Sequence, residues 1–166
     1  MSRDIARNFI VYSLMLVIQL YIFNHFNLLG FITPFIYIII FILYKTTYNK
    51  TILIIVGFII GMIVDLSLQT YGCHTLASIT VCFFRSKIEK YSFGINSNLP
   101  LAMIKGTKSV NRLSYFGIII LVHTLIYYTL LFFSLNFIST ILYYTIVNSI
   151  VTFILVWIIS QLVYKK

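Results

Sequence analysis

Apolar residues run along the chain in long stretches that short polar breaks interrupt. Six such stretches are present: Phe9–Phe23, Leu28–Tyr44, Thr51–Leu68, Gly72–Phe84, Tyr115–Leu135 and Phe137–Val163. The hydrocarbon core of a bilayer is about 30 Å thick, so a helix needs about 20 apolar residues to cross it. The third, fifth and sixth stretches meet this requirement, whereas the second and fourth are short. The pattern predicts an all-α integral membrane protein with six transmembrane helices in one compact bundle.

The composition supports a membrane protein. Of the 166 residues, 61% are hydrophobic and only 9% are charged, whereas a water-soluble domain carries about 25% charged residues. The first apolar stretch lacks an Ala-x-Ala-like cleavage site and is followed by Asn24-His25-Phe26-Asn27, so we expect a retained span and not a signal peptide. We therefore expect residues 1–166 to form a single transmembrane domain.

A proline divides the second apolar stretch. Thr33 as N-cap and Pro34 at the first helical position would begin a helix there, but that helix would be too short to span alone. Two arrangements remain open. Either Leu28–Thr33 crosses the outer boundary as irregular backbone, or one helix continues with a bend at Pro34. Because non-helical backbone at membrane depth must be shielded by protein, the second and fourth spans should lie against other helices.

The basic residues predict the orientation of the chain. All twelve lie in the N-terminal tail, the second loop, the fourth loop and the C-terminal tail: Arg3, Arg7, Lys45, Lys50, Arg85, Lys87, Lys90, Lys105, Lys108, Arg112, Lys165 and Lys166. With six spans these segments share one side, which the positive-inside rule places in the cytoplasm together with both termini. A five-span arrangement, with Gly72–Phe84 re-entrant, would export the most basic loop and is rejected.

The fourth loop, residues 85–114, is the main predicted cytoplasmic surface. Its basic residues are Arg85, Lys87, Lys90, Lys105, Lys108 and Arg112, and its one acid is Glu89. A short helix beginning with Asn98 as cap could lie in the interface plane. The loop is either a solvated basic segment or a docking surface for a cytoplasmic partner or anionic lipid. The net charge of +9 does not predict nucleic-acid binding, because the basic residues flank spans.

The third span carries the most informative polar pattern. Ionisable residues inside a membrane are costly and often functional, and Asp65 and His123 fall well inside the predicted spans. Gly57, Gly61 and Asp65 are four residues apart and form one stripe. Two glycines at this spacing let a second helix approach closely, and its donors could then bond the carboxylate. Asp65 is thus either a buried contact that fixes packing or serves a partner, or an interfacial residue at the outer end of the span.

Three further residues are candidates for helix packing or partner contacts. Gly72 allows a tight outer turn, and His74 begins the fourth span either as an interfacial histidine or as a partner contact. His123 is either a bonded packing residue or a polar contact with the helix that carries Asp65.

No motif predicts catalysis or a cofactor. The sequence contains no Gly-x-Ser-x-Gly, His-Glu-x-x-His or Walker pattern, and one intramembrane carboxylate excludes a two-carboxylate mechanism. Cys73 and Cys82 fit no metal motif. We expect neither catalytic residues nor a metal or other cofactor.

Two runs in the chain resemble the bacterial rod shape-determining protein MreD family. They are Gly57–Leu66, which is rich in glycine and contains Asp65, and Tyr71–Ala77, which forms a turn with Gly-x-His and a small residue. The length, the six-span layout and the basic cytoplasmic ends also match. The basic loop before the fifth span is longer than in many members, so no role can be carried over to it.

The resemblance implies a non-enzymatic scaffold of the bacterial inner membrane. Members act with the bitopic protein MreC in the cell-elongation complex, which couples MreB filaments to the peptidoglycan synthase and transpeptidase and maintains cell shape. Their fold is similar to the S components, the membrane-embedded substrate-binding subunits of energy-coupling vitamin transporters. The competing hypothesis is a small-molecule binding subunit of a transporter, which requires a polar, ligand-sized cavity open to the outside.

Overall fold

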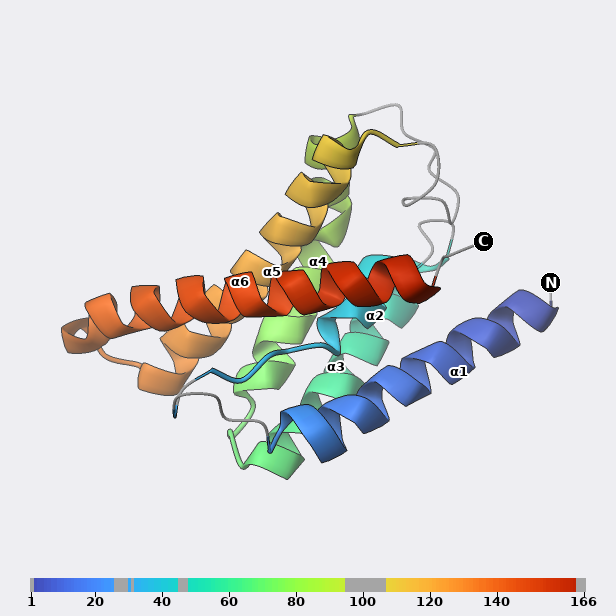
Figure 1. Cartoon of the computed structure of the whole chain (residues 1–166). Coiled ribbons are helices and arrows are strands. Elements are labelled where there is room, and N and C mark those ends of the chain that lie inside the picture. Colours follow the sequence, from blue (N-terminus) through green and yellow to red (C-terminus); the bar gives the residue numbers. More distant parts are fainter. Residues whose placement is uncertain (1, 26–29, 31, 45–47, 95–106, 164–166) are drawn as a thin grey trace.

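The computed structural model consists of helices packed around a buried, partly non-helical segment (Figure 1). It describes residues 2–25, 30, 32–44, 48–94 and 107–163. The helices are α1 (Ser2–Ile18), α2 (Ile38–Leu43), α3 (Lys50–Leu68), α4 (Cys73–Phe93), α5 (Ser109–Phe132) and α6 (Ile138–Val163). A π-helical turn, Gln19–Phe23, extends α1, and a 3-10 turn, Leu135–Phe137, precedes α6.

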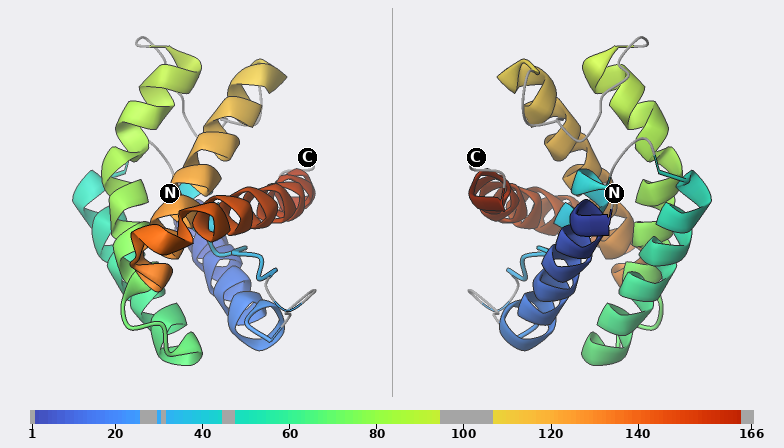
Figure 2. Two further views of the ribbon diagram at one scale, coloured as in Figure 1. Left: turned by 90° about the vertical axis from the view of Figure 1, so that its left-hand side faces the viewer. Right: turned by 90° about the vertical axis from the view of Figure 1, so that its right-hand side faces the viewer.

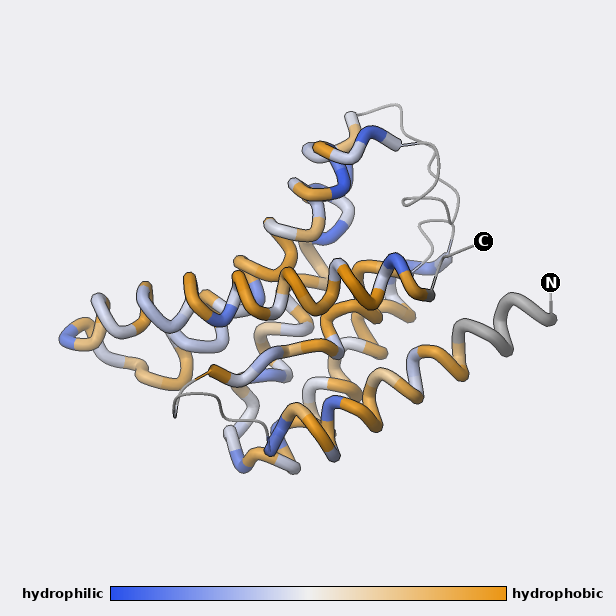
Figure 3. Tube along the Cα trace, viewed as in Figure 1, coloured by the Kyte–Doolittle hydropathy of each residue, from blue (hydrophilic) through white to orange (hydrophobic). Residues whose placement is uncertain are grey.

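Within the described residues, three helical segments are long and apolar enough to cross a bilayer: Lys50–Leu68, Ser109–Phe132 and Leu135–Leu162. Phe9–Phe23 is a shorter apolar segment. Figure 3 shows that hydrophobic residues run along much of these helices, and on α6 Ile146, Ile150 and Ile154 are each more than half exposed. Such a long exposed apolar face suits lipid or another membrane helix and not water. The prediction of an all-helical protein with helices able to cross a membrane is confirmed for the described residues. The six crossings stay a prediction.

Neighbouring helices in the sequence are also neighbours in space. α3 packs against α4, α4 against α5, and α5 against α6. Figure 2 shows α3 and α4 on one side of the molecule and α1 and α6 on the other. The short α2 lies between them and touches α1, α4, α5 and α6. Residues from 35 to 42 are almost completely buried, so this segment forms the centre of the core.

The second apolar stretch enters the core as irregular backbone. No helix begins at Pro34: residues 33–35 are non-helical, a turn follows, and α2 begins only at Ile38. Thr33 is therefore not a helix cap, and the expectation of a helix beginning at Pro34 is wrong. Of the two arrangements left open, the continuous helix with a bend at Pro34 is therefore absent, whereas most of Leu28–Thr33 lies outside the described residues.

Side chains of other elements satisfy the backbone of this segment. The Thr33 amide donates to Asn148 Oδ1 at 2.8 Å, and the Phe35 amide donates to Thr152 Oγ1 at 3.1 Å. Both acceptors belong to α6, and Pro34 between them has no amide hydrogen to satisfy. The α6 side chains thus replace the hydrogen bonds that a helix would have supplied within its own backbone.

Gln19, in the π-helical turn after α1, is a further side chain that bonds the backbone of the irregular segment. Its Oε1 accepts from the Tyr37 amide at 3.3 Å, and its Nε2 donates to the Pro34 carbonyl oxygen at 3.2 Å and to Asn24 Oδ1 at 3.0 Å. The side chain is almost fully buried. A single glutamine therefore ties the end of α1 to both sides of the irregular segment.

We expect Gln19→Leu to lower the thermal unfolding temperature of the detergent-solubilised protein. The change leaves the buried Tyr37 amide and Pro34 carbonyl without their partner, and each unsatisfied buried group costs about 1–3 kcal/mol. Gln161→Leu is the matched control, because Gln161 is exposed on α6. Equal unfolding temperatures for the two variants would contradict the role assigned to Gln19.

The helix predicted as the fourth span extends into the segment predicted as a basic loop. α4 continues to Phe93, and α5 begins at Ser109 instead of Tyr115. Arg85 lies inside α4 with 3% exposure, donates to the Tyr44 carbonyl oxygen, and has Glu89 at 3.7 Å. Its assignment to an exposed basic surface is therefore wrong. The buried guanidinium instead satisfies a carbonyl at the end of α2.

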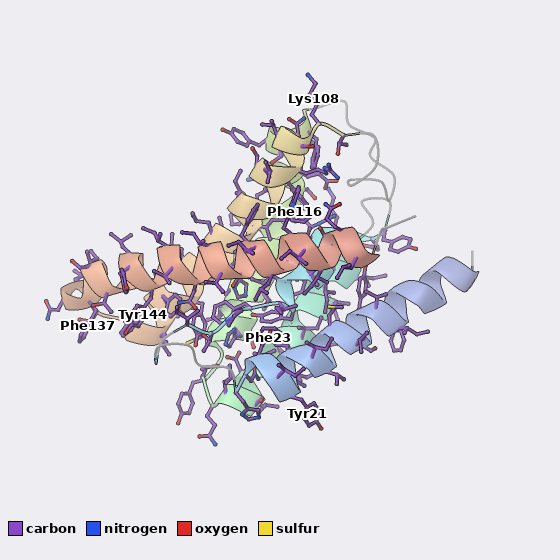
Figure 4. The ribbon with its side chains drawn as sticks, viewed as in Figure 1. Tyr21, Phe23, Lys108, Phe116, Phe137 and Tyr144 are labelled. Atoms are coloured by element: carbon purple, nitrogen blue, oxygen red, sulfur yellow. The ribbon has the colours of Figure 1, made fainter. Side chains whose placement is uncertain are left out.

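The other basic candidates are less buried. Lys87, Lys90 and Lys108 are exposed, and Figure 4 shows Lys108 at the tip of the α4–α5 pair. Arg112 is half-buried, with its guanidinium 5.6 Å from the centroid of the Trp157 ring. Lys105 and the helix expected after Asn98 lie outside the described residues.

Candidate functional site

The glycine stripe of α3 lies against α4. A Cβ atom added at Gly61 would lie 2.5 Å from the Cα of Thr75 and 2.9 Å from the carbonyl oxygen of His74. A Cβ at Gly57 would lie 2.7 Å from the Sγ of Cys82. The close approach predicted for this stripe is therefore present, and at Gly61 it brings the two helix backbones into direct contact.

Asp65 continues the stripe and binds the beginning of α4. Its Oδ1 accepts from the His74 amide at 3.0 Å and from the Thr70 hydroxyl. Its Oδ2 accepts from the Thr75 amide at 2.8 Å and from the Thr75 hydroxyl at 2.6 Å. The first amides of a helix have no partner within the helix, and its N-terminus favours negative charge. The Asp65 carboxylate therefore acts as an N-terminal cap supplied by a neighbouring helix.

The short turn between α3 and α4 makes this capping geometry possible. Gly72 has a φ of 95°, which suits glycine, whereas Gln69 and Tyr71 also have positive φ values of 56° and 51°. The turn reverses the chain within a few residues, so α4 begins beside the carboxylate. Asp65 is only 6% exposed, which favours the alternative of a buried contact that fixes helix packing.

His74 points into the protein instead of lying at an interface. Its side chain is fully buried, and its Nδ1 lies 3.0 Å from the Tyr37 hydroxyl. His123, on α5, is also fully buried, and its Nε2 lies 2.7 Å from the same hydroxyl. The two histidines are therefore bridged by Tyr37, and we call these three residues the His–Tyr–His cluster. The bridge connects His123 to α4, and among the described residues no hydrogen bond joins His123 to Asp65 on α3.

Aromatic rings enclose the cluster. The Tyr127 ring stacks on His74 with centroids 4.3 Å apart, and the Phe35 ring meets His74 edge-on at 5.0 Å. Phe35 also meets the His123 ring at 5.7 Å. By contrast, the labelled Tyr21 projects outward in Figure 4.

Tyr37 was not identified from the sequence. The chain has 13 tyrosines, and nothing in the local pattern distinguishes Tyr37 from those expected to pack or to lie at the membrane interface. Its role depends on the irregular path of the segment before α2, which brings the hydroxyl between α4 and α5. The only available signal was Pro34, which marked this stretch as an unusual span.

Cavities in the described part of the chain include three near its surface turns. One of about 520 Å³ beside the α3–α4 turn is lined by Asp65, Gln69, Thr75 and apolar neighbours. A second of about 430 Å³ lies on the other side of the same turn, and a third of about 500 Å³ lies at the α5–α6 turn. None of the three is lined by the His–Tyr–His cluster.

The ligand-binding chemistry of the site is limited. Within the described ranges, no group of three or more His, Cys, Asp or Glu side chains is placed to hold a metal ion. Cys73 and Cys82 are both free thiols, and Cys82 is buried beside Gly57. The arrangement is chemically suited to holding helices together, because its carboxylate oxygens are all occupied by donors of the same chain.

The fold and the apolar surface define a class: a helical membrane protein with a buried polar centre joining α3, α4, α5 and the irregular segment. No protein-family model, curated protein or solved structure matches the chain.

Proposed function

We propose that this chain is a non-enzymatic scaffold of the bacterial inner membrane, similar to MreD. In this role it binds a bitopic MreC-like protein, and through it the chain contributes to positioning peptidoglycan synthesis by the elongation complex. The observation that carries the proposal is the Asp65 carboxylate, which accepts four hydrogen bonds from Thr70, His74 and Thr75. The residues that give the resemblance therefore hold two helices together. This structural role supports a scaffold.

The proposal includes six crossings with both termini in the cytoplasm. In Figure 1 the N- and C-terminal ends of the chain lie on the same side of the molecule. Lys50 begins α3, and Lys90 lies in the last turn of α4. These helix ends face away from the α3–α4 turn, whose residues 69–72 contain no Lys or Arg. This distribution supports the orientation expected from the positive-inside rule.

Surface available for a partner is found on the outer helices. α6 exposes an isoleucine or leucine at every fourth residue from Ile138 to Leu162, and α1 exposes Phe9, Leu14 and Val17. α1 makes few contacts with the rest of the protein apart from α2 and its own π-helical turn. Such faces can accept lipid or the single membrane helix of a bitopic partner.

The test is depletion combined with co-purification in a rod-shaped host that carries the chain. We expect depletion to round the cells, and we expect an MreC-like protein to co-purify from native membranes after mild crosslinking. The exposed-site variant Gln161→Leu serves as the matched control for tagged expression. Rods of normal shape after depletion, with no such partner recovered, would refute the scaffold.

A second candidate is a small-molecule binding subunit of a transporter. The cavity of about 520 Å³ beside the α3–α4 turn favours it, because it combines polar Asp65, Gln69 and Thr75 with apolar Met62 and Leu66. Against it, all four bonds to Asp65 are made by the chain itself. A ligand that raises the thermal unfolding temperature, and loses this effect in Gln69→Ala, would favour the transporter subunit over the scaffold.

A further inference from the structure

The Tyr37 hydroxyl lies between two histidine nitrogens but carries a single proton. Nδ1 of His74 is 3.0 Å from the hydroxyl oxygen and Nε2 of His123 is 2.7 Å from it. The other ring nitrogens, His74 Nε2 and His123 Nδ1, are buried and have no hydrogen-bond partner among the described residues. We call these two atoms the outer nitrogens of the cluster.

Proton accounting determines what the outer nitrogens require. With both rings neutral, each histidine carries one N–H and one lone pair. If Tyr37 donates to His123 Nε2, then His74 donates from Nδ1, and both protons lie on Nδ1. If Tyr37 donates to His74 Nδ1, then His123 donates from Nε2, and both protons lie on Nε2. In either case the two histidines share one tautomer, and one outer nitrogen is a donor while the other is an acceptor.

We propose that the outer nitrogens of His74 and His123 are binding sites for internal water, one donating to a water molecule and the other accepting from one. A buried N–H without a partner destabilises the folded protein, and internal water commonly satisfies such groups. The Ser78 hydroxyl adds a third polar group. It is one helical turn after His74 on α4 and is fully buried.

Water fits these atoms better than a metal ion does. A metal held by His74 Nδ1, His123 Nε2 and the Tyr37 oxygen would leave both outer nitrogens as N–H donors. Histidines that bind metals almost always donate this second N–H to a carboxylate, a carbonyl or water. No described protein group accepts from either outer nitrogen, so a bound metal ion would require a water acceptor at both of them. A neutral hydrogen-bonded cluster with water needs only one such donor and one such acceptor.

The test is ¹⁵N NMR of the full chain, labelled at histidine and reconstituted in lipid bilayers. The chain has three histidines, and exposed His25 supplies an internal reference for a solvated ring. We expect His74 and His123 to be neutral and in the same tautomer, with magnetisation transfer from water to the outer N–H. The wild-type protein alone decides this result, so it does not depend on any variant folding.

Two variants test the bridge itself. Tyr37→Phe keeps the ring and removes the hydroxyl, so we expect the tautomers of His74 and His123 to become independent, with a change at one ring or both. Tyr115→Phe is the matched control: Tyr115 is equally buried, but its hydroxyl lies 3.5 Å from the Ile42 carbonyl oxygen, and we expect both histidine signals to stay unchanged.

Three outcomes would overturn the proposal. Opposite tautomers in the wild type would show that Tyr37 donates elsewhere and accepts from both histidines. Resolved outer N–H signals that receive no magnetisation from water would exclude bound water. Added Zn²⁺ that shifts both histidine signals at one equivalent, with the effect lost in Tyr37→Phe, would identify a metal site instead.

Discussion

Gly61→Ala is expected to destabilise the protein strongly, although it adds only one methyl group. The new Cβ would lie 2.5 Å from the Cα of Thr75, and a backbone atom cannot move aside by changing a rotamer. Overpacking of this kind costs about 1–3 kcal/mol and sometimes more. We expect a corresponding loss of unfolding free energy in mixed detergent micelles, monitored by fluorescence of Trp157, the single tryptophan. Gly61→Leu should go further and prevent accumulation of folded protein.

The control for this prediction is a second helical glycine. Gly117, on α5, has no heavy atom within 4 Å of an added Cβ. Alanine is a better helix former than glycine by about 1 kcal/mol, so Gly117→Ala should leave stability unchanged or raise it. If Gly61→Ala and Gly117→Ala were equally stable, α3 and α4 would not be in the close contact described above.

Gly57 should respond more mildly than Gly61. Its added Cβ would meet the Sγ of Cys82 at 2.7 Å, and a side-chain sulfur can move by changing rotamer. We therefore expect Cys82→Ala to rescue most of the loss caused by Gly57→Ala. The same second change should not rescue Gly61→Ala, because the obstruction there is backbone.

Asp65→Ala is the second change expected to have a large effect. It removes the acceptor of four donors: the amides of His74 and Thr75 and the hydroxyls of Thr70 and Thr75. A buried donor without a partner costs about 1–3 kcal/mol. The His74 amide bond is buried and the other three are partly buried, so we expect a loss at the upper end of this range. Asp65→Asn retains one oxygen but turns an amino group toward donors, and we expect an intermediate loss. The measurement is the same unfolding free energy.

Two comparisons separate capping from a general effect of losing a polar side chain. Thr75→Val removes one hydroxyl donor and leaves the Thr75 amide bonded, so its loss should be much smaller. Asn136→Ala changes an exposed polar residue at the α5–α6 turn and should be neutral. If Asp65→Ala behaved like Asn136→Ala, the carboxylate would contribute nothing to holding α4 in place.

The Asp65 variants also connect stability with the proposed function. As a scaffold residue, Asp65 should affect assembly more than any chemical activity, so Asp65→Asn should reduce co-purification of an MreC-like partner. A folded Asp65→Asn protein that retains its partner would restrict Asp65 to internal packing. Expression of the variants at equal level in membranes is required, since loss of folded protein would reduce recovery by itself.

The sequence by itself determined the class of this protein and the location of its closest helix contact. Length and apolar composition identify helices that can cross a bilayer, because each of these is a property of one continuous segment. The Gly57–Gly61–Asp65 stripe was visible for the same reason: a four-residue spacing places side chains on one helix face without any knowledge of the neighbour.

Only the tertiary structure decided which groups meet. Tyr37 lies 37 residues from His74 and 86 from His123, and no local pattern relates three such distant segments. The failure of a helix to begin at Pro34 has the same origin, because Asn148 and Thr152 on α6 and Gln19 after α1 satisfy the irregular backbone. Arg85 was expected at the surface but is buried, because the end of α2 supplies a carbonyl oxygen that accepts from its guanidinium. Buried polar groups need partners, and the fold alone determines which partners come within reach.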